Sequence, residues 1–127
     1  MSTGTQSHSK RARNLILFVG CALAWFIFDR VVKTIIDSQY EKGDVFVDSV
    51  LGLFQFRLVH NTGAAWGSFE NWTPIIAAIS AVICIAILIA AFVYANRANV
   101  IEMISLALIY AGGLGNLFDR VTQGYVV

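Results

Sequence analysis

Three long apolar runs separated by polar segments form the dominant pattern of this chain. The runs cover residues 14–36, 75–94 and 100–118. Each is close to the roughly 20 residues that a helix needs to cross a bilayer. Because a helix satisfies its own backbone hydrogen bonds, runs of this length predict membrane-spanning helices. We therefore expect a mostly α membrane protein, with its three predicted helices in one transmembrane bundle.

A polar segment, residues 37–73, joins the first two runs. Two stretches in it, Val45–Val47 and Leu53–Val59, favour short strands, and Gly43 and Gly52 favour turns beside them. We therefore expect a small antiparallel sheet at the membrane surface, where aromatic side chains are at home. The aromatic residues expected at that level are Phe54, Phe56, Trp66, Phe69 and Trp72.

The distribution of charge predicts an orientation. The segment 37–73 is net acidic, whereas basic residues gather in the head, residues 1–13, and in the turn at Arg97. The positive-inside rule places the head, which we expect to be disordered, and this turn in the cytoplasm. The polar ends of the first and third helices then lie outside together with 37–73. Residues 119–127 begin a further outer segment of this single membrane domain.

Composition supports a membrane protein and narrows its function. The 127 residues are 57% hydrophobic and 13% charged, and the mean hydropathy is +0.69. Soluble domains average about 45–50% apolar and about 25% charged residues. A net charge of +1 gives no bulk attraction to nucleic acid. Cys21 and Cys84 lie inside apolar runs without metal or redox spacing, so we expect neither a metal site nor a cofactor.

Asp29 and Lys33 interrupt the end of the first apolar run. They are four residues apart, so they share one helix face, with the acid on the N-terminal side. The two charges can neutralise each other, and ionisable groups inside apolar segments usually have a role. The alternative is that both lie at the interface, where Lys33 reaches toward water. We expect that interfacial arrangement for Arg30.

A second polar motif, His60–Gly67, follows the predicted second strand. Asn61 offers both a donor and an acceptor, which suits a peptide backbone. Gly63 and the alanines after it leave room for another chain to approach closely. The alternative is an ordinary turn into the next helix. We expect His60 to be a loop histidine because no serine or cysteine nucleophile pairs with it.

A third polar motif, Gly112–Arg120, ends the third apolar run. Asn116, Asp119 and Arg120 lie within about one helical turn. Arg120 can make forked hydrogen bonds to a carboxylate or to backbone carbonyls. Asp119 is either a partner of Arg120 or a catalytic acid. Small residues thin the helix and allow tight packing; they are Gly112, Gly113 and Gly115.

Four successive motifs together resemble those of the bacterial lipoprotein signal peptidases (signal peptidase II). They are Asp29–Lys33, Asn61–Gly67, Gly112–Arg120 and Gly124–Val127. The resemblance covers their order and spacing and the number of spans. It implies an inner-membrane enzyme with four helices, of which this chain holds three, and an outer β-cradle. Such enzymes cut the signal peptide from prolipoproteins just before a diacylglycerol-modified cysteine.

The resemblance implies aspartic proteolysis, in which two aspartates share a proton and activate a water without a metal. In the family, the first aspartate directly follows the Val-Val pair matched by Val126–Val127, and the second lies in an Asn-x-Ala-Asp motif on the fourth helix. The chain contains neither, so we expect a truncated, inactive fragment. Its implied partners are lipidated prolipoproteins and membrane lipids. The residues implied to bind substrate or support the site are Asn61, Gly113, Asn116, Asp119 and Arg120, braced by Asp29 and Lys33.

A rival interpretation is a small, non-enzymatic membrane scaffold or binding protein. In that case the pairs Asp29–Lys33 and Asp119–Arg120 serve only to hold helices together.

Overall fold

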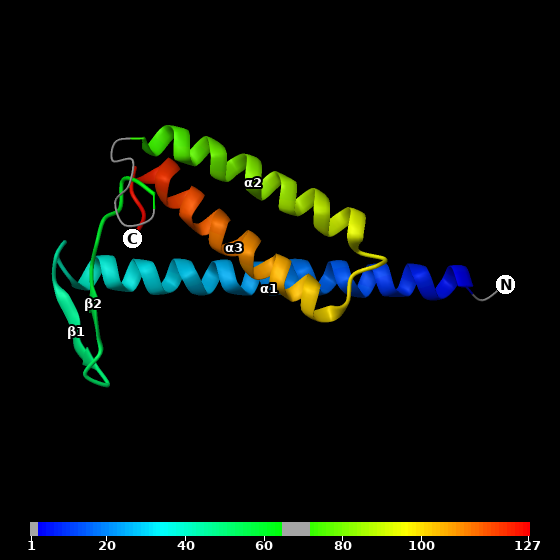
Figure 1. The fold of residues 1–127 in the computed structure, drawn as a ribbon, viewed down its shortest axis with the longest axis horizontal. Helices are drawn as coiled ribbons and strands as arrows, with labels where there is room; N and C mark the ends of the chain where they lie inside the picture. Colours follow the sequence, from blue (N-terminus) through cyan, green and yellow to red (C-terminus); the bar gives the residue numbers. More distant parts are fainter. Residues whose placement is uncertain (1–2, 65–71) are drawn as a thin grey trace.

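A computed structural model describes residues 3–64 and 72–127 (Figure 1). The three helices of the described residues are each long and apolar enough to cross a membrane, as the sequence predicts. Helix α3 packs against both α1 and α2, so it is the central element of the bundle. Trp66 and Phe69, expected at the headgroup level, lie outside the described residues. The elements in chain order are α1 (Thr3–Gln39), β1 (Val45–Val50), β2 (Phe54–Arg57), α2 (Thr73–Tyr94) and α3 (Val100–Thr122).

Helix α1 continues back through most of the head, residues 1–13, for which we expected disorder. A buried asparagine ties this part of the helix to the bundle. Asn14 is fully buried, and its Nδ2 donates to the carbonyl oxygens of Ala95 and Ala98, at 2.9 Å each. These contacts hold α1 against the turn between α2 and α3, and the helix extends beyond them.

Local sequence signals account for the starts of α2 and α3. Pro74 lies in the first turn of α2, where its missing amide hydrogen costs no helical bond. Asn99 caps α3: its Oδ1 accepts from the amide of Glu102 at 2.9 Å, and Glu102 Oε2 accepts from the amide of Asn99 at 2.8 Å. Glu102, the one acid near the start of the third apolar run, is therefore part of a capping box. Helix α3 ends at Thr122, four residues beyond the predicted boundary.

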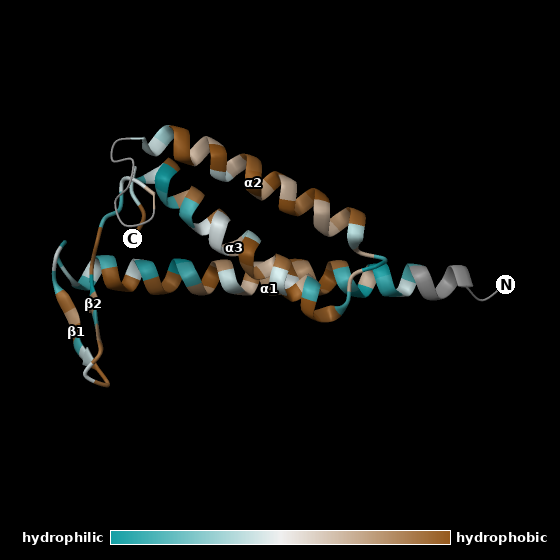
Figure 2. Cartoon of the chain, in the orientation of Figure 1, coloured by the Kyte–Doolittle hydropathy of each residue, from teal (hydrophilic) through white to brown (hydrophobic). Residues whose placement is uncertain are grey.

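Every fourth residue of α3 is buried over most of its length. Small residues in this stripe let neighbouring helices approach closely, and Phe18 and Ala22 of α1 join its apolar part. Hydrophobic residues dominate α2 and the middle of α1 (Figure 2), and many large apolar side chains of the three helices are exposed, as expected for contact with lipid. The stripe ends on a charged residue at the hairpin end; its members are Met103, Ala107, Ala111, Gly115 and Asp119.

Strands β1 and β2 form the predicted antiparallel hairpin, with irregular register along it. Its turn has positive φ angles at Leu51 (54°) and Gly52 (73°), and the amide of Leu53 donates to the carbonyl of Val50 at 3.0 Å. Two positive φ angles match the twist of a tight hairpin. The hairpin and the C-terminus lie at the same end of the bundle (Figure 1). The polar end of α1, the segment after β2 and the end of α3 therefore lie at one end of the bundle.

Candidate functional site

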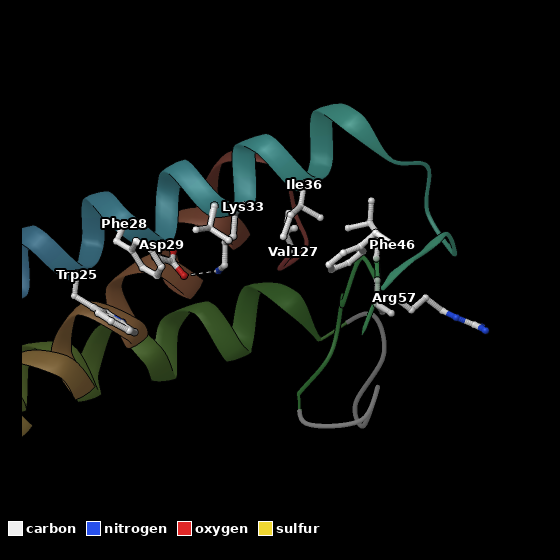
Figure 3. Close-up of a pocket in the computed structure, with 11 residues that line it drawn as sticks. Trp25, Phe28, Asp29, Lys33, Ile36, Phe46, Arg57 and Val127 are labelled. Carbon is white, nitrogen blue, oxygen red and sulfur yellow. Dashed lines mark ion pairs between the residues drawn. The ribbon is translucent and has the colours of Figure 1, made fainter. Parts of the chain in front are cut away.

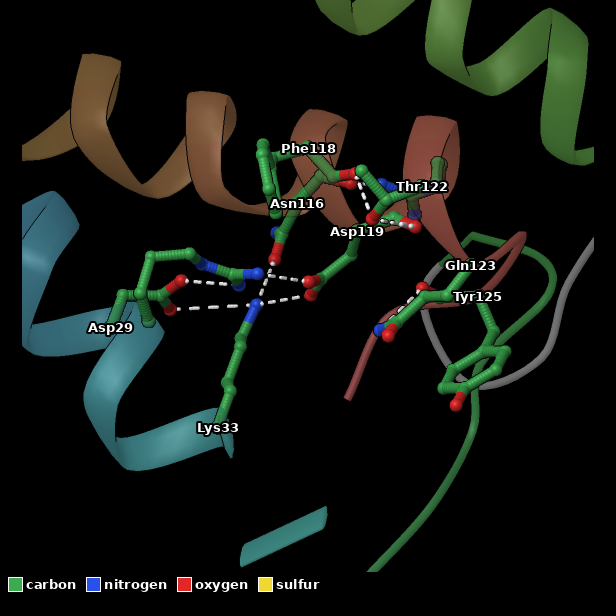
Figure 4. A network of polar contacts seen from close by, with 10 residues as sticks. Asp29, Lys33, Asn116, Phe118, Asp119, Thr122, Gln123 and Tyr125 are labelled. Carbon is green, nitrogen blue, oxygen red and sulfur yellow. Dashed lines mark hydrogen bonds and ion pairs between the residues drawn. The ribbon is translucent and has the colours of Figure 1, made fainter. Parts of the chain in front are cut away.

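The charged end of α1 meets the charged end of α3 at the hairpin end of the bundle (Figure 4). Lys33 is the meeting point. Its Nζ lies 2.8 Å from Asp119 Oδ2 and donates to Asn116 Oδ1 at 2.9 Å. Asp29 Oδ1 lies 3.4 Å from the same nitrogen, as the four-residue spacing predicts. Lys33 therefore donates two hydrogen bonds to α3 and makes a further ion pair with Asp29 on its own helix.

Asp119 is held between two cations. Its side chain is 1% exposed, Oδ2 faces Lys33, and Oδ1 accepts from Arg30 Nη1 at 2.5 Å. A buried carboxylate without partners is costly, but two hydrogen-bonded cations compensate for its desolvation. Its ion pairs are with α1 and not with Arg120, so one of our two expectations for it is wrong. Both of its oxygens are occupied, which leaves it poorly suited to act as a catalytic acid.

Arg30 lies inside the bundle, which corrects our expectation that it reaches toward the interface. Its Nη2 donates to Asp29 Oδ2 at 2.8 Å, and its Nη1 binds Asp119. The guanidinium also lies 5.1 Å from the ring centroid of Phe118, within the range of a cation–π contact. We call Asp29, Arg30, Lys33 and Asp119 the ion cluster. It contains two cations and two anions and therefore neutralises itself.

Two glycines of the third motif have different surroundings. A Cβ at Gly115 would lie 2.5 Å from Asp29 Oδ2, closer than real contacts allow. Only glycine therefore lets the Asp29 carboxylate come this near to α3. A Cβ at Gly113 would instead lie 3.2 Å from Cys84 Sγ on α2. The structure thus places Gly113, an expected site residue, at the α2–α3 contact, and it brings Gly115 to the site in its place.

Arg120 joins α3 to the loop after β2. Its Nη2 donates to the carbonyl of Gly63 at 3.1 Å, and its Nη1 donates to the carbonyl of Asn116 at 3.3 Å. Its buried Nε has no hydrogen-bond partner among the residues that the structure describes. The side chain of Asn61 shapes the same loop, because its Nδ2 donates to the carbonyl of Ala64 and its Oδ1 accepts from the Gly63 amide, each at 2.9 Å. Arg120 is thus set up to bind backbone carbonyls.

The segment after α3 lies beside these groups. The amide of Asn61 donates to the carbonyl of Val126 at 2.8 Å, and the amide of Val126 donates back at 2.9 Å. Val127 then lines a pocket of ≈ 330 Å³ between α1 and the hairpin, together with Asp29 and Lys33 (Figure 3). It also lines a second, more polar pocket of ≈ 260 Å³ that shares Lys33. All four polar motifs therefore converge at one end of the bundle.

This arrangement is suited to binding and bracing. The carboxylates of the ion cluster are engaged by cations, so none of them is free to act as a base. Within residues 3–64 and 72–127, no group of three or more His, Cys, Asp or Glu side chains is placed to hold a metal ion. At this end of the bundle, the two pockets that Val127 lines are open to a ligand, whereas the guanidinium of Arg120 is engaged by two backbone carbonyls.

Comparison with known proteins agrees with these motifs. Residues 21–127 match the family model described as signal peptidase (SPase) II. The lipoprotein signal peptidase of Moorella thermoacetica is 35% identical over 87% of this chain and 72% of its own length. That of Clostridium acetobutylicum is 37% identical over 80% of this chain and 64% of its own length. A solved bacterial membrane enzyme superimposes with a TM-score of 0.72 at 28% identity, over 86% of this chain and 65% of its own.

Proposed function

The chain belongs to the signal peptidase II family, and from this premise we propose that it forms the substrate-binding and bracing part of a lipoprotein signal peptidase. One observation carries the proposal: the first and third motifs meet at Lys33 in a neutral ion cluster, and the other two join the same end of the bundle through Arg120 and the Asn61–Val126 pairing. Such a cluster fixes α1 against α3 and consumes no group that an incoming substrate would need. The two pockets that Val127 lines are open beside it, and the buried Nε of Arg120 is a donor without a partner among the described residues.

The proposed chemistry is aspartic proteolysis of a peptide bond. Two carboxylates held close cannot both ionise readily, so one acts as acid and the other as base toward a water. Asp29 and Asp119 are unsuited to this role because each is paired with cations. The resemblance places the first catalytic aspartate directly after the pair matched by Val126–Val127. These 127 residues contain neither aspartate of that dyad, so we propose that they are inactive alone.

The proposed substrate is a prolipoprotein whose cysteine carries a diacylglyceryl group. Arg120 already donates to the carbonyl of Gly63, and a forked guanidinium of this kind suits the carbonyls of an extended signal peptide. The apolar lining of the pocket between α1 and the hairpin, including Trp25, Phe28 and Phe46, suits acyl chains. Membrane lipids surround the bundle in this proposal.

The proposed location is the bacterial inner membrane, crossed several times, with the N-terminus in the cytoplasm. Lys10 Nζ donates to the carbonyl of Arg97 at 3.1 Å. This contact gathers the basic residues of the head and of the α2–α3 turn at the end opposite the site. The positive-inside rule then supports a site on the outer side.

A non-enzymatic scaffold is less well supported. Of the two pairs that the scaffold interpretation named, Asp29–Lys33 is formed within α1, but Asp119–Arg120 is not, because the ion pairs of Asp119 are with α1. The relatives reported above are named as peptidases.

Binding of a lipidated peptide to this chain tests the proposal. The probe is a fluorescent signal peptide ending in a diacylglyceryl-modified cysteine, titrated in detergent micelles, with the unmodified peptide as reference. We expect saturable binding of the lipidated probe only. R120M should weaken it by about tenfold, the scale of one lost hydrogen bond to a charged group, while R97M at the opposite end should not. Equal binding by both variants, or binding without saturation, would refute the proposal.

A further inference from the structure

A second group of titratable side chains lies outside the ion cluster. His60 Nε2 lies 2.6 Å from Oδ1 of Asp37, a residue in the last turn of α1. The ring of His60 stacks on the ring of Tyr125, with centroids 3.9 Å apart and planes 19° from parallel. We call Asp37, His60 and Tyr125 the clasp. It joins three segments that are far apart in sequence: the end of α1, the segment after β2 and the segment after α3.

Backbone pairing continues directly from the clasp. The residues that follow His60 and Tyr125 are Asn61 and Val126, and these exchange two hydrogen bonds of 2.8 and 2.9 Å. Side chains therefore join His60 to Tyr125, and main-chain hydrogen bonds join the adjacent pair, Asn61 and Val126. A single isolated pair of backbone hydrogen bonds is weak by itself, so side chains beside it decide whether it persists.

The clasp borders the ion cluster without belonging to it. Asp37 lines the polar pocket that Lys33 and Val127 also line. Asp37 and His60 are 28% and 23% exposed, so water screens their attraction only in part. Partial burial and the nearby Asp37 carboxylate raise the pKa of Tyr125, consistent with a phenol held close to that acid.

We propose that the clasp is a positioning device that fixes Val126 and Val127 beside Lys33. Its contribution to catalysis rests on the proposed function, in which the chain beyond Val127 supplies the first aspartate. The clasp residues themselves touch no reacting atom in this proposal. They act through the backbone, by holding the segment that would aim that aspartate at the site.

Amide hydrogen exchange on this chain in detergent micelles tests the clasp. The measured quantities are the exchange rates of the Asn61 and Val126 amides, each relative to the buried Ala107 amide of α3, so that general loosening does not count. H60F keeps a ring for stacking but removes the contact with Asp37. We expect both amides to exchange about tenfold faster, the scale of one lost charge-assisted hydrogen bond. D48N, at an exposed acid of β1, is the matched control and should leave them unchanged.

Two variants at Tyr125 keep the test decisive if H60F fails to fold. Y125L removes the stacked ring, and we expect the same acceleration as for H60F. Y125F restores an aromatic ring and should restore slow exchange, a rescue that loss of bulk alone would not explain. The ¹⁵N signal of His60 should also move in D37N and stay in place in D48N. Wild-type exchange in both H60F and Y125L would overturn the proposal. Because no substrate is present, this result is independent of whether the chain binds the lipidated probe.

Discussion

Lys33 on α1 and Asp119 on α3 form an ion pair of 2.8 Å in which the aspartate is 1% exposed. With the Arg30–Asp119 pair it links these two helices, and it lies where the buried stripe of α3 ends. Removing one member of such a pair leaves the other charged and poorly solvated.

Replacing Lys33 with methionine should destabilise the fold strongly. K33M leaves Asp29 and Asp119 with Arg30 as their one shared cation, and breaking a buried pair in this way costs about 3–5 kcal/mol. The free energy of unfolding in detergent, measured by denaturant titration, reports the loss. K42M removes an exposed lysine in the loop before β1 and should change it by less than about 0.5 kcal/mol. Similar stability for the two variants would mean that the ion cluster does not brace the bundle.

A double substitution should recover part of that loss. In K33M/D119L no charge of the pair remains, and apolar replacements of a buried ion pair are often neutral. We expect the double variant to be less destabilised than the sum of K33M and D119L by at least about 1 kcal/mol, the coupling of neighbouring residues. Additive losses would show that the two side chains do not interact.

Two glycines of α3 should respond oppositely to alanine. G115A places a methyl group against the Asp29 carboxylate, and overpacking of this kind costs about 1–3 kcal/mol. G112A meets nothing within 4 Å, so the higher helix propensity of alanine should make it neutral or more stable by about 0.5–1 kcal/mol. Thermal melting of both variants in one detergent measures the difference. Equal melting temperatures would contradict the close approach of α1 and α3.

Tyr125 should ionise at higher pH than a free tyrosine. Partial burial and the Asp37 carboxylate raise its pKa above the usual value of about 10. Because the folded state holds the proton more tightly, the stabilisation is complete below the unfolded pKa and is lost as pH rises through the folded one. The difference in tyrosinate absorbance between wild type and Y125F measures this titration. D37N should lower the midpoint, and an unchanged midpoint would place Asp37 too far away to act.

The helices and their meeting point could be predicted from sequence because bilayer length and buried charge leave few alternatives. Runs of about 20 apolar residues determine the spans, and the i, i+4 spacing places Asp29 beside Lys33. Pro74 and Gly52 mark the start of a helix and a turn for local reasons. These features depend on neighbours in sequence or on the membrane.

The partners of Arg30 and Asp119 depend on how α1 and α3 pack, which sequence patterns do not encode directly. Arg30 lies near the end of an apolar run, where an arginine usually reaches the interface. It turns toward α3 instead, because Asp119 and Phe118 lie across from it. One sequence signal could have indicated the inward position of Arg30: Phe26 lies four residues earlier on the same helix face, and its ring centroid is 5.9 Å from the guanidinium. Gly115 and Gly113 are likewise equivalent in sequence, and only their neighbours in the packed bundle, Asp29 and Cys84, distinguish them.

Cleavage of a diacylglyceryl-modified prolipoprotein is the decisive assay for the proposed division of roles between this chain and the segment after it. Two purified proteins are compared: the 127-residue chain, and the same chain continued after Val127 by the part of the Moorella thermoacetica relative that follows the match. We predict that the continued chain cleaves the lipidated substrate and not the unmodified one, that K33M abolishes its cleavage, and that the 127-residue chain cleaves neither. Cleavage by the 127-residue chain alone, or a folded continued chain that leaves the lipidated substrate intact, would contradict the account.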